Sequence, residues 1–338
     1  ITVLCVSSGP LLLVANSGVT NGVNGLSVYR ADTATGAPSF LSNVNAGNTP
    51  WSVALTPNGL YGYVGNWVGG TISSYSINST AGTVSPIPLS SPVSNNPTSI
   101  AMDRLGRFIW VTNWGYHTVS AFSIGTNGVL AAAGVPMTGL ALPYKIVAHS
   151  TADFVYIVNS AAAGGQIAVY SVNSSTGALT LLQTLGNAVS SPESMVIDPS
   201  GRFLYVANDS GSVGAFAINA TTGQLTTIGY VNTGSGAYGV AMHPNGQYVY
   251  AVSSATSNNV RVFAINPTTG ALTLAAGSPY SAGSNPRGVA VNATGTKLYV
   301  TNYVSNTVSA FSIGGSTLTP LGTPIATGSN PTGIAVVP

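Results

Sequence analysis

The stretch "KLYVTNYVSNTVSAFSI", residues 297–313, reads as two short strands joined by a turn. Close variants of it occur elsewhere in the chain: "GYVGNWVGGTISSYSI" (62–77), "FIWVTNWGYHTVSAFSI" (108–124) and "FLYVANDSGSVGAFAI" (203–218). A two-strand unit that recurs along a chain indicates a repeat architecture, and the repeat then decides the fold.

The repeat has a regular period of 45 to 50 residues. Its first strand ends in a polar residue: Asn16, Asn66, Asn113, Asn159, Asn208, Ser253 and Asn302. The residue three positions earlier is aromatic in all copies but the first: Leu13, Tyr63, Trp110, Tyr156, Tyr205, Tyr250 and Tyr299. The next strand always carries a central aromatic residue: Tyr29, Tyr75, Phe122, Tyr170, Phe216, Phe263 and Phe311. The chain therefore contains seven repeats.

Each repeat reads as four strands. A short apolar strand, as in "RGVAVNATG" (287–295), is followed by a Gly-containing turn, two strands such as "KLYVTN" and "TVSAFSI", and a ragged fourth strand. Both alternating positions of the two middle strands are apolar or small, which is typical of strands buried on both faces. At this period, the pattern predicts an all-β fold, a seven-bladed β-propeller of four-stranded antiparallel blades. We expect residues 1–338 to form one propeller domain.

The repeated motifs also resemble a known family. "YVTN" (299–302), "YVAN" (205–208) and "WVTN" (110–113), with "NPRGVAV" (285–291) and "DPSGRFLYVAN" (198–208), look like the YVTN-repeat β-propellers. That family is similar to the seven-bladed lactonase propellers, whose named member is 6-phosphogluconolactonase. The resemblance covers essentially the whole chain and implies the fold. Its motif residues are structural, so no catalytic residue is carried over.

Composition limits the classes of partner. Charged residues make up 4% of the chain, against about 25% in an average protein, and the net charge is +2. Without a basic face, the chain is not expected to bind nucleic acid. So few charges resist association poorly, which favours an extracellular or cell-surface protein over a cytosolic one. The chain starts "ITVLCVSSGP" without Met, so we expect any secretion signal to have been removed.

No cofactor or metal is expected. Cys5 is the only cysteine, which excludes an intrachain disulfide and a thiolate cluster, and the three histidines are dispersed along the sequence. No apolar run is long enough to span a bilayer.

First-strand segments outnumber the blades. Eight such segments begin near Thr2, Ser52, Ser99, Lys145, Ser194, Gly239, Gly288 and Gly333, whereas seven blades offer seven inner positions. Either "ITVLCVSSG" (1–9) or "TGIAVVP" (332–338) could close the ring. The other segment would lie at an edge of the same molecule, or pair with a neighbouring molecule and cause self-association.

The candidate site lies where the copies differ. The loop before each first strand is expected to lead into the central tunnel. The residues just before the first-strand segments are Trp51, Thr98, Tyr144, Glu193, Tyr238, Arg287 and Thr332. Glu193 and Arg287 are charged where the other copies are neutral, and Lys145 follows one position later in its copy. Loops between the second and third strands add Trp67, Trp114, Tyr116, His117, Asp209 and Tyr303 on the same face. Aromatic surfaces with a few charges suit a sugar-like ligand. The alternative is that Glu193 and Arg287 simply pair with each other or lie solvated at the tunnel mouth.

Two functions remain open at this point. The first is an exported, non-enzymatic propeller that serves as a surface, matrix or self-assembling module and binds a glycan through Trp51, Trp67, Trp114, Tyr144, Tyr238, Glu193 and Arg287. The alternative is a lactonase-like hydrolase. In it, Glu193 would activate water and Arg287 or Lys145 would stabilise the oxyanion. A phosphorylated sugar lactone would require more positive charge than this face offers.

Overall fold

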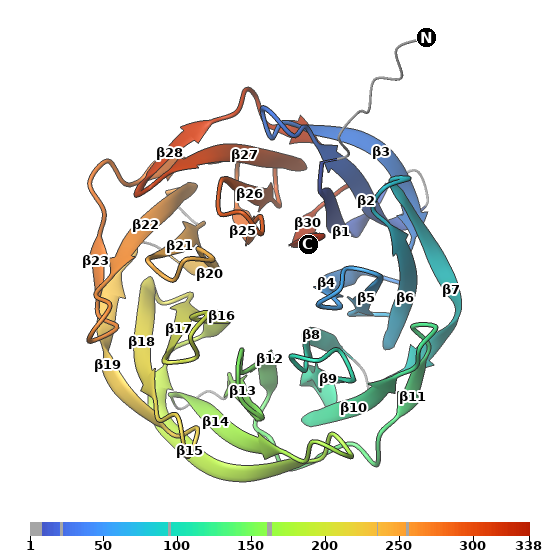
Figure 1. Ribbon diagram of the computed structural model, residues 1–338, viewed down its shortest axis with the longest axis vertical. Helices are drawn as coiled ribbons and strands as arrows, with labels where there is room; N and C mark the ends of the chain where they lie inside the picture. Colours follow the sequence, from blue (N-terminus) through green and yellow to red (C-terminus); the bar gives the residue numbers. More distant parts are fainter. Residues whose placement is uncertain (1–8, 21–22, 94–95, 161–163, 235, 255–256) are drawn as a thin grey trace.

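The protein is a seven-bladed β-propeller, as the repeats predicted (Figure 1). In this computed structural model, residues 9–20, 23–93, 96–160, 164–234, 236–254 and 257–338 are described. Within these ranges, thirty strands form seven antiparallel sheets around a central axis. Among the described residues, no helix has the length and hydropathy that a membrane span requires.

The strands fall into four concentric sets. The first strand of each blade lines the tunnel: β30 (Pro331–Val336), β4 (Pro50–Leu55), β8 (Pro97–Met102), β12 (Pro143–Ala148), β16 (Pro192–Ile197), β20 (Ala237–Met242) and β25 (Pro286–Val291). The second strands are β1 (Leu11–Thr20), β5 (Tyr61–Asn66), β9 (Phe108–Asn113), β13 (Phe154–Asn159), β17 (Phe203–Asn208), β21 (Tyr248–Ser253) and β26 (Lys297–Asn302). In this order they belong to blades 1 to 7.

The outer half of each blade is more variable. The third strands are β2 (Val23–Ala31), β6 (Thr71–Asn78), β10 (Thr118–Ile124), β14 (Gly165–Val172), β18 (Ser212–Ile218), β22 (Asn259–Ile265) and β27 (Thr307–Gly314). The fourth strands are β3 (Pro38–Asn45), β7 (Thr83–Pro92), β11 (Leu130–Ala132), β15 (Leu179–Val189), β19 (Leu225–Asn232), β23 (Leu272–Leu274) and β28 (Thr317–Pro320). Short strands β24 (Tyr280–Ser281) and β29 (Ile325–Ala326) add to β22 and β27, and one 3-10 turn, η1, spans Trp114–Tyr116.

The C-terminal segment closes the ring. Strand β30 pairs with β1, with Leu12 opposite Val336 and Val14 opposite Ile334, so blade 1 combines both ends of the chain. The C-terminal candidate, residues 332–338, thus supplies the inner strand of blade 1. Residues 1–8, including Cys5, lie outside the described residues, and self-association through this segment stays a prediction.

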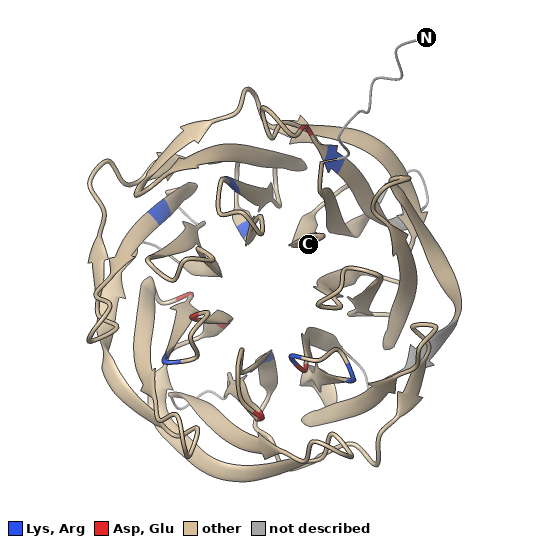
Figure 2. Cartoon of the chain, viewed as in Figure 1, with Lys and Arg blue, Asp and Glu red and all other residues tan. Residues whose placement is uncertain are grey.

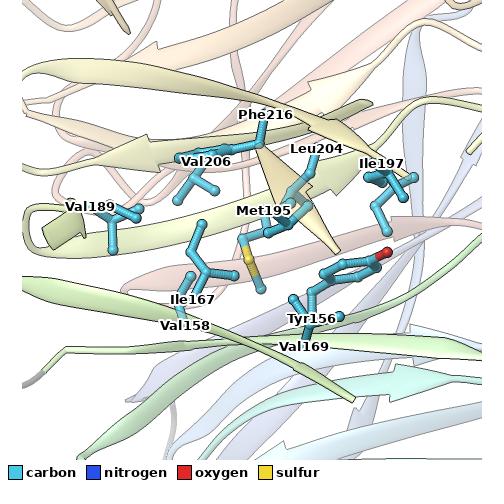
Figure 3. Packing of buried hydrophobic residues seen from close by; sticks show 13 residues of the cluster. Tyr156, Val158, Ile167, Val169, Val189, Met195, Ile197, Leu204, Val206 and Phe216 are labelled. Carbon is cyan, nitrogen blue, oxygen red and sulfur yellow. The ribbon is translucent and has the colours of Figure 1, made fainter. Parts of the chain in front are cut away.

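Neighbouring blades are held together by apolar side chains. Each of seven clusters of buried residues combines the middle strands of one blade with those of the next. Figure 3 shows the junction of blades 4 and 5, where Tyr156 and Ile167 face Met195 and Leu204. Tyr299 packs toward blade 1, whereas Val300 and Phe311 pack toward blade 6. The two-sided apolar pattern of the middle strands therefore comes from packing between blades.

In five blades, the aromatic residue of the second strand also forms a polar link to the next blade. Its hydroxyl or ring N–H donates to the carbonyl of a glycine in the turn between the third and fourth strands. These bonds run from Tyr63 to Gly128 (3.0 Å), Trp110 to Gly177 (2.8 Å), Tyr156 to Gly223 (2.9 Å), Tyr205 to Gly270 (2.9 Å) and Tyr299 to Gly36 (3.0 Å). The last of them joins blade 7 to blade 1 across the closure.

We expect Tyr299→Phe to destabilise the propeller by about 1–3 kcal/mol, because it leaves the buried Gly36 carbonyl without its donor. The free energy of unfolding in urea measures this effect. Tyr116→Phe removes the same atom from a side chain that is 58% exposed and serves as the matched control. Equal stability of the two variants would contradict this account of the closure.

The recurring asparagine joins three segments of its own blade. Asn302 donates to the hydroxyls of Thr307 and Ser309 in the third strand, at 3.0 and 2.9 Å. Its side-chain oxygen accepts the N–H of Gly283 at 3.0 Å, in the loop that leads to the tunnel. Asn66 forms the same set of bonds with its own neighbours. A motif residue of the repeat is therefore used to support the tunnel entrance.

Candidate functional site

A β-bulge in every blade sets one residue apart at the start of the first strand. In blades 2, 4, 5, 6 and 7 this residue lines the tunnel cavity with its side chain, whereas the hydroxyls of Thr98 and Thr332 are buried and donate to carbonyls of neighbouring strands. In blade 5, for example, Pro192 pairs with Asn208 and Ser194 pairs with Ala207, so that Glu193 has no partner on β17. The other blades have a register shift at the same place. Bulges commonly redirect a side chain beside a functional site. We call these residues the inner ring: Trp51, Thr98, Tyr144, Glu193, Tyr238, Arg287 and Thr332.

The backbone before each bulge is held in an uncommon conformation. In six blades, within the described residues, a non-glycine residue with positive φ comes just before the first strand: Thr49, Asn96, Leu142, Ser191, Asn285 and Asn330, with φ from 49° to 60°. Such residues, especially Thr and Leu, are strained and are found where a site demands them. The repeated strain indicates that the surrounding fold holds the position of the inner ring.

A second set of residues surrounds the inner ring. In every blade, the residue after the recurring Asn or Ser donates its N–H to the carbonyl of the residue before the first strand, at 2.8–3.0 Å. This bond keeps the loop between the second and third strands beside the tunnel entrance. We call these residues the outer ring: Ser17, Trp67, Trp114, Ser160, Asp209, Ser254 and Tyr303.

The inner ring opens into a cavity of about 300 Å³ in the tunnel. Of the eight residues predicted to bind a ligand or act in catalysis, six line it together: Trp51, Tyr144, Lys145, Glu193, Tyr238 and Arg287. The other two, Trp67 and Trp114, do not line it. They continue outward from Trp51 instead. The ring centroids of Trp51 and Trp67 are 5.5 Å apart, and those of Trp67 and Trp114 are 5.7 Å apart.

Glu193 is a half-buried carboxyl group with an altered acidity. Burial raises its pKa to about 7, and the negative charge of Asp209 acts in the same direction. A hydrogen bond from Tyr144 and the positive charges of Arg287 and Lys145 oppose the shift without cancelling it. A carboxyl group with such a pKa changes charge near neutral pH, as a general base requires.

Arg287 lines the same cavity and is held among aromatic rings. Its guanidinium carbon lies 4.1 Å from the ring centroid of Tyr303, 5.1 Å from that of Tyr238 and 5.8 Å from that of Trp51. Its Nε donates to the side chain of Asn285 at 3.2 Å. Cation–π contacts of this kind orient a guanidinium and leave its remaining N–H groups for a ligand.

Lys145 and Tyr144 complete the charged part of the cavity. Burial lowers the pKa of Lys145, and the carboxylate of Glu193 partly restores it. Burial also raises the pKa of Tyr144, which stays a hydrogen-bond donor to Glu193. Glu193, which titrates near neutral pH, therefore lies close to the cation of Lys145 and to the hydroxyl donor of Tyr144.

The two charges of the inner ring do not form an ion pair. Within the described residues, the ion pairs are Arg104 with Asp153 (3.7 Å) and Arg107 with Asp103 (2.9 Å). Figure 2 shows how sparsely charged residues are spread over the blades. The interaction of Glu193 with Arg287 is Coulombic, and it leaves both groups available to a bound molecule.

Close approach of the first strands, which the sequence analysis missed, also shapes the ring. A Cβ atom on Gly239 would overlap the carbonyl oxygen of Arg287, and one on Gly288 would overlap that of Thr332. These glycines therefore let blades 6, 7 and 1 converge and place Arg287. The signal was available in the repeat, since blades 2 to 5 carry Ser52, Ser99, Lys145 and Ser194 at this position.

His117 does not line the cavity. It is exposed at the end of η1, with a φ of 58°, and its Nδ1 accepts the N–H of Leu142 at 3.3 Å. A role in the turn therefore accounts for it.

Known proteins that resemble this chain include seven-bladed propellers of the lactonase type. A family model described as "Lactonase, 7-bladed beta-propeller" matches residues 12–142, 138–237 and 229–335. Comparison with curated proteins gives no match. Among solved structures, a "putative 6-phosphogluconolactonase" from Bacteroides fragilis is 20% identical, with a TM-score of 0.85 and 99% of both chains covered. A periplasmic gluconolactonase from Pseudomonas aeruginosa is 19% identical, with a TM-score of 0.82 and 97% of this chain and 99% of that chain covered. At such identities the structures establish the fold alone.

The family match contradicts the expectation of a non-enzymatic scaffold and favours the alternative. That expectation was drawn from the low charge and the regular repeats, which are properties of the shell of a propeller. The tunnel has a different composition, because three of the few charged residues are gathered in one cavity.

Proposed function

Because the chain belongs to the lactonase family of seven-bladed β-propellers, we propose that it hydrolyses a lactone in the cavity at its tunnel mouth. One observation carries the proposal. The carboxyl group of Glu193, with a pKa of about 7, shares this cavity with two cations and is paired to neither. Lactone opening needs a base for water and a positive charge for the oxyanion, and this arrangement supplies both.

Glu193 acts as the general base. Its carboxylate takes a proton from a water molecule while the water oxygen bonds to the lactone carbonyl carbon. The bond between that carbon and the ring oxygen then breaks, and the proton returns from Glu193 to the departing alkoxide. The net reaction adds one water to the lactone and yields a hydroxy acid.

Arg287 and Lys145 stabilise the oxygen on which negative charge develops. Arg287 is suited to this because its three aromatic neighbours hold it before substrate arrives, so little reorganisation is needed during the reaction. Lys145 contributes a second positive charge from the first strand of blade 4. Tyr144 orients the Glu193 carboxylate through its hydrogen bond.

The substrate is an uncharged lactone. Two cations and one carboxylate line the cavity, and Asp209 adds a negative charge that acts on Glu193. A phosphate group of charge near −2 would lack a cluster of cations to bind it. This balance argues against a 6-phosphorylated sugar lactone and favours a neutral aldonolactone.

The first test is the pH dependence of the reaction. We expect the purified protein to open glucono-δ-lactone with kcat/KM rising between about pH 6 and 8, because Glu193 accepts a proton only above its pKa of about 7. An alkaline decline is expected below 10.5, since the pKa of Lys145 is lowered from that value. A pH-stat measures both limbs after the uncatalysed rate is subtracted.

A protein that opens no lactone of a panel of five- and six-membered rings, at any pH in this range, would contradict the proposed function. Comparison of glucono-δ-lactone with its 6-phosphate in the same assay tests the charge argument separately. A preference for the phosphate would contradict that argument alone.

A further inference from the structure

Three of the four tryptophans of the chain form a row at the tunnel mouth. The row starts at Trp51 in the cavity and continues through Trp67 of blade 2 to Trp114 of blade 3. Successive rings are tilted by 39° and 33°, so they do not cover one another face to face. All three are only half-buried, which leaves apolar surface open at the entrance.

The repeats show that the fold does not require this row. Trp67 and Trp114 belong to the outer ring, where the same backbone hydrogen bond is formed by Ser17, Ser160 and Ser254 in other blades. The local structure is thus compatible with a small polar residue. The fourth tryptophan is different, because Trp110 is fully buried between blades 3 and 4 and bonds to Gly177. Packing explains Trp110. Trp114 donates one long hydrogen bond, from Nε1 to the hydroxyl of Ser160 at 3.4 Å, but neither Trp67 nor Trp114 is buried between blades.

The position of the row relative to the cavity indicates which part of a bound ligand would contact it. Trp51 lines the cavity, whereas Trp67 and Trp114 lie beyond its lining, so a lactone ring bound beside Glu193 would reach only the first of them. The charged groups of the cavity belong to blades 4, 5 and 7, and the row lies on blades 2 and 3. The loop that carries Trp114 continues with the exposed side chain of Tyr116, which is uncharged.

We propose that the row binds a second, neutral ring attached to the lactone, so that the preferred substrate is an aldonolactone carrying a glycosyl or aryl substituent. This inference rests on the proposed function and extends it to the substrate class. Aromatic side chains bind the C–H face of a sugar ring or the face of an aryl group without any charge. A glycosyl and an aryl substituent would be bound by the same apolar contacts, and the experiment below distinguishes them.

The experiment compares substrates that differ only in the second ring. We expect cellobiono-δ-lactone, which adds a glucosyl group to glucono-δ-lactone, to have a kcat/KM about five- to tenfold higher. In the Trp67→Ser/Trp114→Ser variant, which uses the residue found in other blades, the ratio should fall to about one. The readout is this ratio and not the rate with either lactone alone, because Trp67 also packs against Trp51 in the cavity. A glucono-δ-lactone with a 4-O-benzyl group in place of the glucosyl group tests the aryl source.

Control variants separate the row from a general loss of apolar surface. Leu60→Ser and Leu105→Ser replace side chains that are 52% and 55% exposed on the opposite face, in turns between first and second strands. They should leave the substrate ratio unchanged. If both lactones are opened equally well by the wild type, or if the ratio survives in the double variant, the inference is overturned and the proposed function stands.

A binding measurement keeps the inference testable without turnover. In the lactams of the two sugars an N–H group replaces the ring oxygen, and they resist hydrolysis. Calorimetry should show that cellobionolactam binds about five- to tenfold more tightly than gluconolactam, and that the double variant loses this difference. Such a result in a protein that opens no lactone would overturn the proposed function and leave the second-ring site intact. Equal binding of the two lactams would overturn the second-ring site.

Discussion

Glu193→Gln is expected to lower kcat/KM for lactone opening by about 10²- to 10⁴-fold, the usual contribution of a positioned general base. The amide keeps the size of the carboxyl group and still accepts a hydrogen bond from Tyr144, but it cannot take a proton from water. The residual rate should lose the limb near pH 7, because the group with that pKa is gone. Initial rates from pH 5 to 9 measure both effects.

Asp209→Asn is the matched control for this prediction. Asp209 is an exposed carboxylate that raises the pKa of Glu193 through its charge, and it does not line the cavity. Its neutralisation should leave the maximal rate intact and move the limb to lower pH. Unchanged turnover in Glu193→Gln, with a circular dichroism spectrum like that of the wild type, would show that Glu193 is not the base.

Arg287→Met is expected to have the second largest effect, a loss of about 10²- to 10³-fold in kcat, comparable to removal of one donor to an oxyanion. Met keeps the apolar contacts with the surrounding rings and removes the charge. A second readout follows from electrostatics. Because Arg287 lowers the pKa of Glu193, its removal should raise that pKa, and the acid limb should move above 7.

Arg104→Met is the control for Arg287. Arg104 pairs with Asp153 on the opposite face, with both side chains 38% exposed, and its loss should change neither the rate nor the acid limb. A lower kcat in Arg287→Met without any shift of the limb would mean that the two groups are not electrostatically coupled. A shift without loss of rate would move the role of oxyanion stabiliser to Lys145.

The seven repeats made most of the fold predictable, because a propeller places every copy in the same environment. Aligning the copies was therefore enough to identify the inner ring and to find Glu193 and Arg287 as departures from a neutral pattern. The same alignment could have identified Gly239 and Gly288, which were read only as strand starts. The scaffold hypothesis failed for a related reason, since composition averages over the whole chain and does not reveal one cavity.

The sequence by itself determined the seven blades, their four strands and the positions at which the copies differ, because strand pairing and packing between blades depend on residue patterns that repeat. Only the tertiary structure decided that β30 closes the ring, since either end carried a suitable strand. The tertiary structure also decided which of the residues that differ between repeats lie in the same cavity. Trp51, Glu193 and Arg287 are far apart in the sequence and meet because the bulge in each of their three blades directs the side chain toward the same cavity. The acidity of Glu193 likewise depends on burial and on charges from other blades, which exist only once the ring has closed.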